Sequence, residues 1–283
     1  MSNLVNYSEV EGHNPKTTTP IALISLSGEV TRRRLLLERN IPEVWVNKHW
    51  HATDLRHKSA TDVASLQNKA VYVKHYGDEL RPAQVGCAES HLAAWRWLIA
   101  SDFAQIIVLE DDIIPFTTDW LRKMENIAVA LMPSAQCGAA YFCHFGPRPE
   151  QLASSPILRI INASVSIFRI RGRNHLWRAH AYMISREAAQ RGLDLQKNGI
   201  SIQIDDFGHF QDKGAFDSVF VAHPALLRQD EEIESTVQLP KNITLNNATS
   251  HQLSIVARIR RKVNELYKGV VRKVSSFPFI TWI

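Results

Sequence analysis

An apolar run that ends in three consecutive acids constrains the fold of this chain more than any other feature. The run covers residues 106–109, and Glu110, Asp111 and Asp112 follow it directly. Consecutive apolar residues rich in Ile and Val predict a buried strand. Carboxylates cannot stay in an apolar layer without compensation, so we expect them at the strand's carboxyl end, where open α/β sheets bind ligands. Such oxygen ligands suit Mg²⁺ or Mn²⁺; the alternative is a solvated acidic turn before Pro115.

Strand-like and helical segments alternate along the rest of the chain, which predicts an α/β fold with a mostly parallel central sheet. Further strands are expected at residues 21–26, 43–46, 139–145, 157–170 (one or two strands), 180–184 and 216–222. Helices are expected at residues 29–40, 82–100 and 118–131 and from about residue 185, and residues 47–77 should form loops around a short helix. We therefore predict a disordered segment (1–19), one catalytic domain (20–240) and a tail (241–283).

The tail carries an uneven share of the net charge of +5. Between Ser254 and Ser275 it has seven basic residues and one acid, with apolar residues at helical spacing, and it ends in an aromatic and apolar sequence over 277–283. A basic amphipathic helix of this kind is typical of segments that lie on a membrane surface. The alternatives are a helix that docks on the domain and a nucleic-acid-binding tail, which no recognition motif supports.

Cysteine content and hydropathy indicate the compartment. The chain has three cysteines without the paired spacing of a zinc site, and its first 20 residues contain no apolar segment. An odd cysteine count fits a reducing cytosol, and a secretory signal would need an apolar core. No stretch reaches the roughly 18 apolar residues of a membrane span. These features predict a cytoplasmic protein.

Two helical segments carry polar residues close to predicted strands. Ser25 and Leu26 end the first strand, and the helix after it carries Arg32 and Arg33, which could bind phosphate. Three arginines on a helix are more often a solvated face. In the helix over 82–100, Cys87 and His91 share a face, although a lone helical histidine more often has a packing role.

A second acid pair, Asp205 and Asp206, lies in an apolar setting. One of these carboxylates could be a general base or a further metal ligand. The alternative is a helix cap or a loop acid.

Four ordered motifs resemble those of glycosyltransferase family 25, which contains bacterial lipooligosaccharide galactosyltransferases. They are Leu-Ile-Ser-Leu at 23–26 with Arg32-Arg33, Gly-Cys-Ala-Glu-Ser-His at 86–91, Val-Leu-Glu-Asp-Asp at 108–112 and Ala-Tyr-Met-Ile-Ser-Arg at 181–186. The resemblance covers roughly residues 21–230. It implies a GT-A-like, Rossmann-like fold that binds a nucleotide sugar.

The resemblance also implies roles for single residues. Asp111 and Asp112 would hold Mn²⁺ or Mg²⁺ against the donor diphosphate, and Glu110 would orient the metal's waters or the sugar. The residues expected to line the donor site are Ser25, Leu26, Arg33, Cys87 and His91. The candidates for the general base are, in order, Asp205, Asp206 and His91. Residues 176–180 are bulkier and more basic than the family's small-residue run, which leaves the acceptor and the donor sugar open.

The implied activity is metal-dependent, inverting transfer of a hexose, with galactose expected, from a UDP-sugar to a cell-surface glycan such as lipooligosaccharide core. The expected partners are a UDP-sugar donor, an oligosaccharide or lipid-linked glycan acceptor and, through the tail, the inner face of the cytoplasmic membrane, but no nucleic acid. Two other functions stay open. One is a Mg²⁺-dependent phosphohydrolase, although its usual DxD-x-[TV] pattern is absent. The other is a non-catalytic peripheral membrane scaffold with a decayed sugar-nucleotide site.

Overall fold

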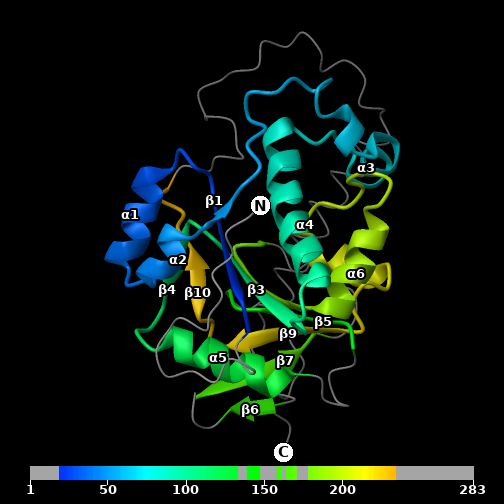
Figure 1. The fold of residues 1–283 in the computed structure, drawn as a ribbon. Helices are drawn as coiled ribbons and strands as arrows, with labels where there is room; N and C mark the ends of the chain where they lie inside the picture. The colour runs from blue at the N-terminus through cyan, green and yellow to red at the C-terminus, as the bar shows by residue number, and fades with distance from the viewer. Residues whose placement is uncertain (1–18, 133–138, 147–157, 161–163, 171–177, 234–283) are drawn as a thin grey trace, which may run out of the picture.

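The computed structural model describes residues 19–132, 139–146, 158–160, 164–170 and 178–233 (Figure 1). The strands are β1 (Ile21–Ser25), β2 (Trp50–His51), β3 (Gln105–Glu110), β4 (Ile113–Pro115), β5 (Tyr141–His144), β6 (Leu158–Ile160), β7 (Val165–Arg169), β8 (Ala181–Ser185), β9 (Ser218–His223) and β10 (Leu227–Gln229). The helices are α1 (Val30–Glu38), α2 (Glu43–Asn47), α3 (Lys69–Tyr76), α4 (Pro82–Ala100), α5 (Trp120–Leu131), α6 (Arg186–Leu195) and α7 (Phe207–Asp212), with a 3-10 turn at Ala64–Leu66. Residues 1–18 of the segment predicted to be disordered over 1–19, and the predicted tail, lie outside the described residues.

The main sheet of the described chain has eight strands in the order β2-β1-β3-β8-β5-β9-β7-β6, and β4 and β10 form a separate antiparallel pair. Six of the eight strands point the same way, whereas β8 and β7 run opposite to them. The α/β architecture is therefore confirmed, with a sheet that is mixed in its pairing. Because β8 is antiparallel to β3 and β5, its first residue meets their carboxyl ends at one edge of the sheet.

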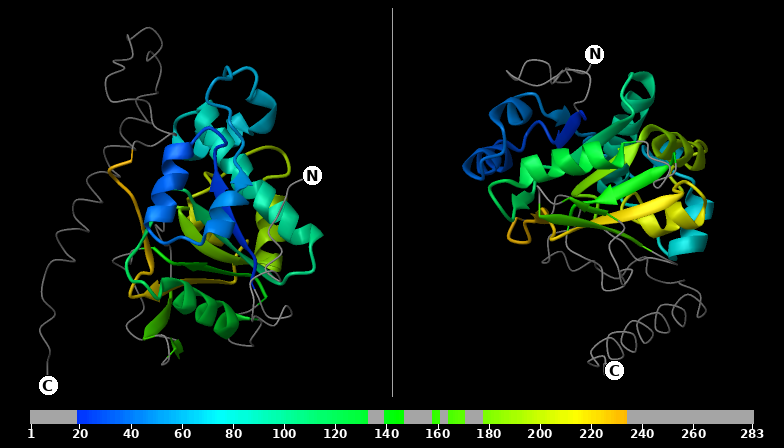
Figure 2. Two further views of the ribbon diagram at one scale, coloured as in Figure 1. Left: turned by 60° about the vertical axis from the view of Figure 1, so that its left-hand side comes forward. Right: turned by 90° about the horizontal axis from the view of Figure 1, so that it is seen from below.

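Side chains alternate between two buried cores on opposite faces of the sheet. Along β3, Ile106 and Val108 belong to the core that α4 and α6 cover. Ile107 and Leu109 belong to the core that α1, α2 and α5 cover. Figures 1 and 2 show these helix groups on the two sides of the sheet. A strand that is buried on both faces explains the unbroken apolar sequence that precedes the acids.

The expected strand at 43–46 is wrong, because Glu43–Asn47 forms helix α2. Its Trp and Val residues favour a strand by propensity. Pro42 stands at the N-cap of the helix, and Trp45 and Val46 are both buried in the core that contains Leu36 of α1. Tertiary packing therefore overrides local propensity here. The short helix expected within 47–77 is α3, whereas β2, β4, β10 and α7 were not expected.

None of the helices in the described part of the chain has the length and apolar character that crossing a membrane requires.

Candidate active site

A cavity of about 970 Å³ lies at the sheet edge where β1 and β3 end and β8 begins. This volume is in the range of small-molecule binding sites. Nine of the residues singled out from the sequence line it: Ser25, Leu26, Arg32, Cys87, His91, Glu110, Asp111, Asp112 and Asp205. The fold thus brings three of the four ordered motifs together with Asp205, whereas Arg33, Asp206 and the motif at 181–186 are not among the lining residues.

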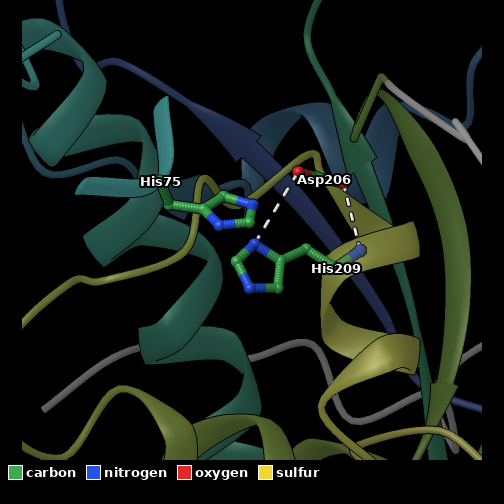
Figure 3. Close-up of side chains that lie close together, drawn as sticks. All are labelled: His75, Asp206 and His209. Carbon is green, nitrogen blue, oxygen red and sulfur yellow. Dashed lines mark hydrogen bonds and ion pairs between the residues drawn. The ribbon is translucent and has the colours of Figure 1, made fainter. Parts of the chain in front are cut away.

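Asp206 serves as the N-cap of α7 (Figure 3). One of its carboxylate oxygens accepts a hydrogen bond from the backbone N–H of His209 at 3.1 Å. The other accepts from the Tyr76 hydroxyl at 3.0 Å. The helix-cap alternative therefore describes Asp206, and this geometry does not favour its candidacy as the general base.

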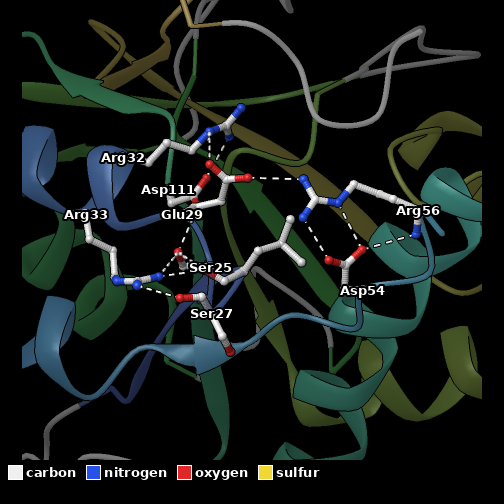
Figure 4. A network of polar contacts seen from close by, with 9 residues as sticks. Ser25, Ser27, Glu29, Arg32, Arg33, Asp54, Arg56 and Asp111 are labelled. Carbon is white, nitrogen blue, oxygen red and sulfur yellow. Dashed lines mark hydrogen bonds and ion pairs between the residues drawn. The ribbon is translucent and has the colours of Figure 1, made fainter.

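Arg33 contacts the loop after β1 (Figure 4). It is not among the residues that line the cavity. Its guanidinium donates to the carbonyl oxygens of Leu26 at 2.6 Å and Ser27 at 2.7 Å. Arg32 lines the cavity in its place and is buried. The sequence contains a signal for this difference, because Arg32 lies one helical turn before Leu36, and these two are the buried residues of α1.

Both carboxylate oxygens of Asp111 have protein partners (Figure 4). The Ser25 hydroxyl donates to Oδ2 at 2.7 Å, and the Arg32 guanidinium donates to Oδ1 at 2.8 Å. Burial raises the pKa of Asp111, while Arg32 and Ser25 oppose the rise. Asp111 therefore has its charge balanced within the protein and ties the end of β3 to β1 and α1.

Asp112 has one oxygen without a protein partner. The side-chain amide of Gln229 donates to Oδ2 at 2.9 Å, whereas Oδ1 is buried and accepts no hydrogen bond from the described residues. Burial, followed by the negative charge of Glu110, raises the pKa of Asp112 to about 7. A buried, unsatisfied carboxylate oxygen is costly. Asp112 is thus better suited than Asp111 to bind a cation.

Asp205 shares these properties on the facing segment of the cavity wall. Its Oδ1 is also buried without a hydrogen bond from the described part of the chain. Burial, followed by the charge of Glu110, raises the pKa of Asp205 to about 6. This carboxyl group is therefore ionised at neutral pH while keeping more basicity than an exposed aspartate has.

Glu110 and His91 form part of a buried hydrogen-bonded chain. Trp95 donates to the Tyr182 hydroxyl oxygen at 2.9 Å, and that hydroxyl lies 2.9 Å from His91 Nδ1. The other ring nitrogen of His91 lies 3.0 Å from the Glu110 carboxylate. The indole N–H can only donate, so the network assigns the Tyr182 proton to His91 Nδ1 and the ring N–H to Glu110. Both nitrogens of His91 are therefore engaged, which argues against His91 as the general base.

The Gly86–His91 motif fixes the loop that closes the cavity on the side of α4. A Cβ on Gly86 would lie 2.4 Å from the backbone oxygen of Thr53, so only glycine permits this approach. Ser90 accepts from the Thr53 backbone N–H at 2.8 Å and donates to the Gly86 carbonyl. Burial raises the pKa of the Cys87 thiol well above its ordinary value. Cys87 is therefore a protonated wall residue and not a thiolate nucleophile.

The lining residues fit a hard divalent cation. Asp112 offers a buried oxygen that accepts no hydrogen bond within the described part of the chain, and Glu110 also lines the cavity. The lining carries eight acids, Asp54, Glu110, Asp111, Asp112, Asp205, Asp230, Glu231 and Glu232, and four arginines, Arg32, Arg56, Arg81 and Arg178. Such a surplus of carboxylate suits Mg²⁺ or Mn²⁺. A second set, Cys87, His91 and Glu110, also places its ligand atoms within 4.8 Å of one another.

Several lining residues were not foreseen from the sequence. Gln229, which holds Asp112, lies on β10 in a region without a motif, so its role depends on the pairing of β10 with β4. Arg56 bridges Asp54 and Glu29 at the mouth of the cavity (Figure 4). It belongs to a segment expected only to form loops, and no local pattern distinguishes it.

One comparison with known proteins found a match. A family model described as glycosyltransferase family 25 (LPS biosynthesis protein) matches residues 18–208, which is more than half of the chain. The matched range includes every site residue predicted from the sequence, and it ends before Gln229 and Asp230. A search of curated proteins found no match.

Proposed function

Because this chain belongs to glycosyltransferase family 25, we propose that it transfers a hexose, with galactose expected, from a UDP-sugar to a hydroxyl group of a cell-surface glycan such as lipooligosaccharide core. Membership makes the chain a glycosyltransferase of LPS biosynthesis. The observation that carries the finer proposal is the unsatisfied oxygen of Asp112 in a cavity where acids outnumber arginines. The position of the cavity at the carboxyl edge of the sheet supports a GT-A-like fold.

The donor explains why the cavity would need a cation. A nucleotide diphosphate is anionic, and the cavity lining is also acidic, so the two repel each other unless a positive ion lies between them. Asp112 and Glu110 would hold Mn²⁺ or Mg²⁺, with Asp111 and Gln229 fixing their positions. When bound, the cation supplies Lewis-acid stabilisation of the leaving diphosphate. Among the lining arginines, Arg32 is paired with Asp111 and Arg56 bridges Asp54 and Glu29, so Arg81 and the exposed Arg178 are the candidates to contact the phosphate oxygens and the nucleotide.

Asp205 is the general base of the proposed reaction. Its carboxylate takes the proton from the acceptor hydroxyl, whose oxygen forms the new bond at the anomeric carbon while the bond to UDP breaks. Attack from the face opposite the leaving group inverts that carbon. A base with a pKa of about 6 is well matched to this step near neutral pH.

The proposal extends to the cellular location of the enzyme. The basic tail over 241–283 would hold it on the inner face of the cytoplasmic membrane, where a lipid-linked acceptor is presented. Sedimentation with anionic liposomes tests this part of the proposal. The full chain should bind the liposomes, and a chain that ends at residue 240 should not.

Release of UDP tests the transferase reaction. The purified chain is incubated with UDP-galactose or UDP-glucose, an oligosaccharide acceptor, and Mn²⁺, Mg²⁺ or chelator, and the glycan product is weighed by mass spectrometry. We expect acceptor-dependent, metal-dependent UDP release and a product heavier by one hexose. UDP release at the same rate with and without acceptor would indicate hydrolysis of the donor. The absence of both turnover and UDP binding would refute the proposal.

A further inference from the structure

A second cluster of metal-binding side chains lies outside the cavity, between α3 and α7 (Figure 3). It consists of His75 from the last turn of α3, Asp206 at the N-cap of α7, and His209 in the first turn of α7. None of the three lines the cavity. The cluster therefore needs an explanation of its own, separate from the transfer reaction.

The three side chains point toward one another. Their nitrogen and oxygen ligand atoms all lie within 4.8 Å of one another. The ring centroids of His75 and His209 are 3.7 Å apart, and His209 Nδ1 is 4.0 Å from an Asp206 carboxylate oxygen. Asp206 and His209 are buried, whereas His75 is exposed, so an ion could enter from the solvent.

The cluster is better suited to bind a metal cation than to have both of its histidine rings protonated. Two imidazolium rings at this separation would repel each other. A neutral imidazole keeps the lone pair that a metal ion requires.

We propose that His75, Asp206 and His209 bind a zinc ion that fastens α3 to α7. Two imidazoles and one carboxylate form a common zinc ligand set, with a fourth position for water. Nitrogen ligands also favour zinc over Mg²⁺ or Mn²⁺, which prefer the all-oxygen acids of the cavity. The two sites would thus discriminate between metals by their chemistry.

The position of this site gives it a structural purpose. The Tyr76 hydroxyl contacts Asp206 at 3.0 Å and accepts from the backbone N–H of Gln203 at 3.2 Å. The segment that carries Asp205 is therefore already attached to α3 at this point. A zinc ion at Asp206 would fix the same segment more firmly, so its effect on stability does not depend on the proposed reaction.

Calorimetric titration of the untagged, metal-free full chain with Zn²⁺ tests the proposal, with Co²⁺ absorption as a second probe. His75→Ala is the central variant, because its side chain is exposed and its loss spares the core. His209→Ala is the second variant, and His57→Ala, at another exposed histidine, is the matched control. Asp112→Asn tests whether the zinc lies in the cavity instead.

We expect one Zn²⁺ site per chain, a d–d band for bound Co²⁺, and a rise in Tm with Zn²⁺. His75→Ala and His209→Ala should each weaken binding by at least about tenfold, whereas His57→Ala and Asp112→Asn should retain it. Equal binding by His75→Ala and His57→Ala would overturn the proposal, as would loss of the zinc site in Asp112→Asn. Absence of any Zn²⁺ binding by the folded chain would also overturn it.

Discussion

The guanidinium of Arg32 lies 2.8 Å from the carboxylate of Asp111, and each side chain is only 9% exposed. This ion pair joins α1 to the end of β3 at the floor of the cavity. It holds Asp111 in place, whereas the next acid, Asp112, has an oxygen that accepts no hydrogen bond from the described residues.

Arg32→Ala should lower the free energy of unfolding by about 3–5 kcal/mol, because it leaves Asp111 as a buried charge without its counter-ion. Arg34→Ala, on the same helix, removes an exposed pair with Glu38 and should change stability by less than about 0.5 kcal/mol. Urea unfolding of both variants measures the difference. Equal stabilities would show that Arg32 does not balance Asp111.

Asp112→Asn should stabilise the metal-free protein at pH 8 while removing its response to Mn²⁺. The pKa of this carboxyl group is about 7 in the folded chain against an ordinary value of 3.8, so the folded state binds the extra proton between these values. The stability it contributes is complete below the ordinary pKa and is lost as pH rises to about 7. The Asn side chain does not ionise, so the variant keeps this stability at pH 8. Its Tm at pH 8 should exceed that of the parent by about 2–4 °C for each kcal/mol recovered.

Thermal melts at pH 5 and pH 8, with and without Mn²⁺, check this prediction. Asp111→Asn is the matched control and should act in the opposite direction, because it deprives Arg32 of its partner. A Mn²⁺-induced rise in Tm that survives in Asp112→Asn would contradict the assignment of the metal ligand.

Asp205→Asn should reduce kcat by about 10²–10⁴-fold, which is the usual contribution of a general base. In the parent enzyme, activity should fall as pH drops through about 6, because protonation removes the base. The residual activity of the variant should lack this acidic limb. Asp102→Asn, at an exposed acid that does not line the cavity, is the control for folding and should keep the parent profile.

Gly86→Ala should destabilise the protein by about 1–3 kcal/mol, because its Cβ would overlap the backbone oxygen of Thr53 at 2.4 Å. Gly28→Ala is the matched control, since its Cβ would have no neighbour within 4 Å. Differential scanning calorimetry compares the two variants. A Tm of Gly86→Ala equal to that of Gly28→Ala would mean that the loop shifts without cost.

The sequence predicted the parts of the fold and site that depend on local pattern. The apolar run of β3 and the acids at its end can be recognised directly in the sequence, and so can the helix that carries Cys87 and His91. The open-sheet rule then places these residues at one edge. The structure places them around one cavity, in agreement with that reasoning.

What the sequence could not predict depends on contacts between distant segments. Trp45 and Val46 favour a strand locally, and only their burial against α1 makes them helical. By residue type, Arg33 and Asp206 are as good candidates for the site as their neighbours Arg32 and Asp205. In the fold, however, the side chain of Arg33 donates to the backbone, and that of Asp206 caps a helix. The partner of Asp112 could not be found locally, because it lies 117 residues away.

The separation of Asp112 and Gln229 in the sequence sets the minimum length of chain that can hold Asp112 in place. Gln229 donates to the side chain of Asp112, and the backbone N–H of Asp230 donates to its carbonyl oxygen at 2.7 Å. During synthesis, every family motif up to residue 208 is made before these two donors. The acid cluster is therefore completed last, and a chain shortened to the matched range would contain all the recognisable motifs without a properly held Asp112.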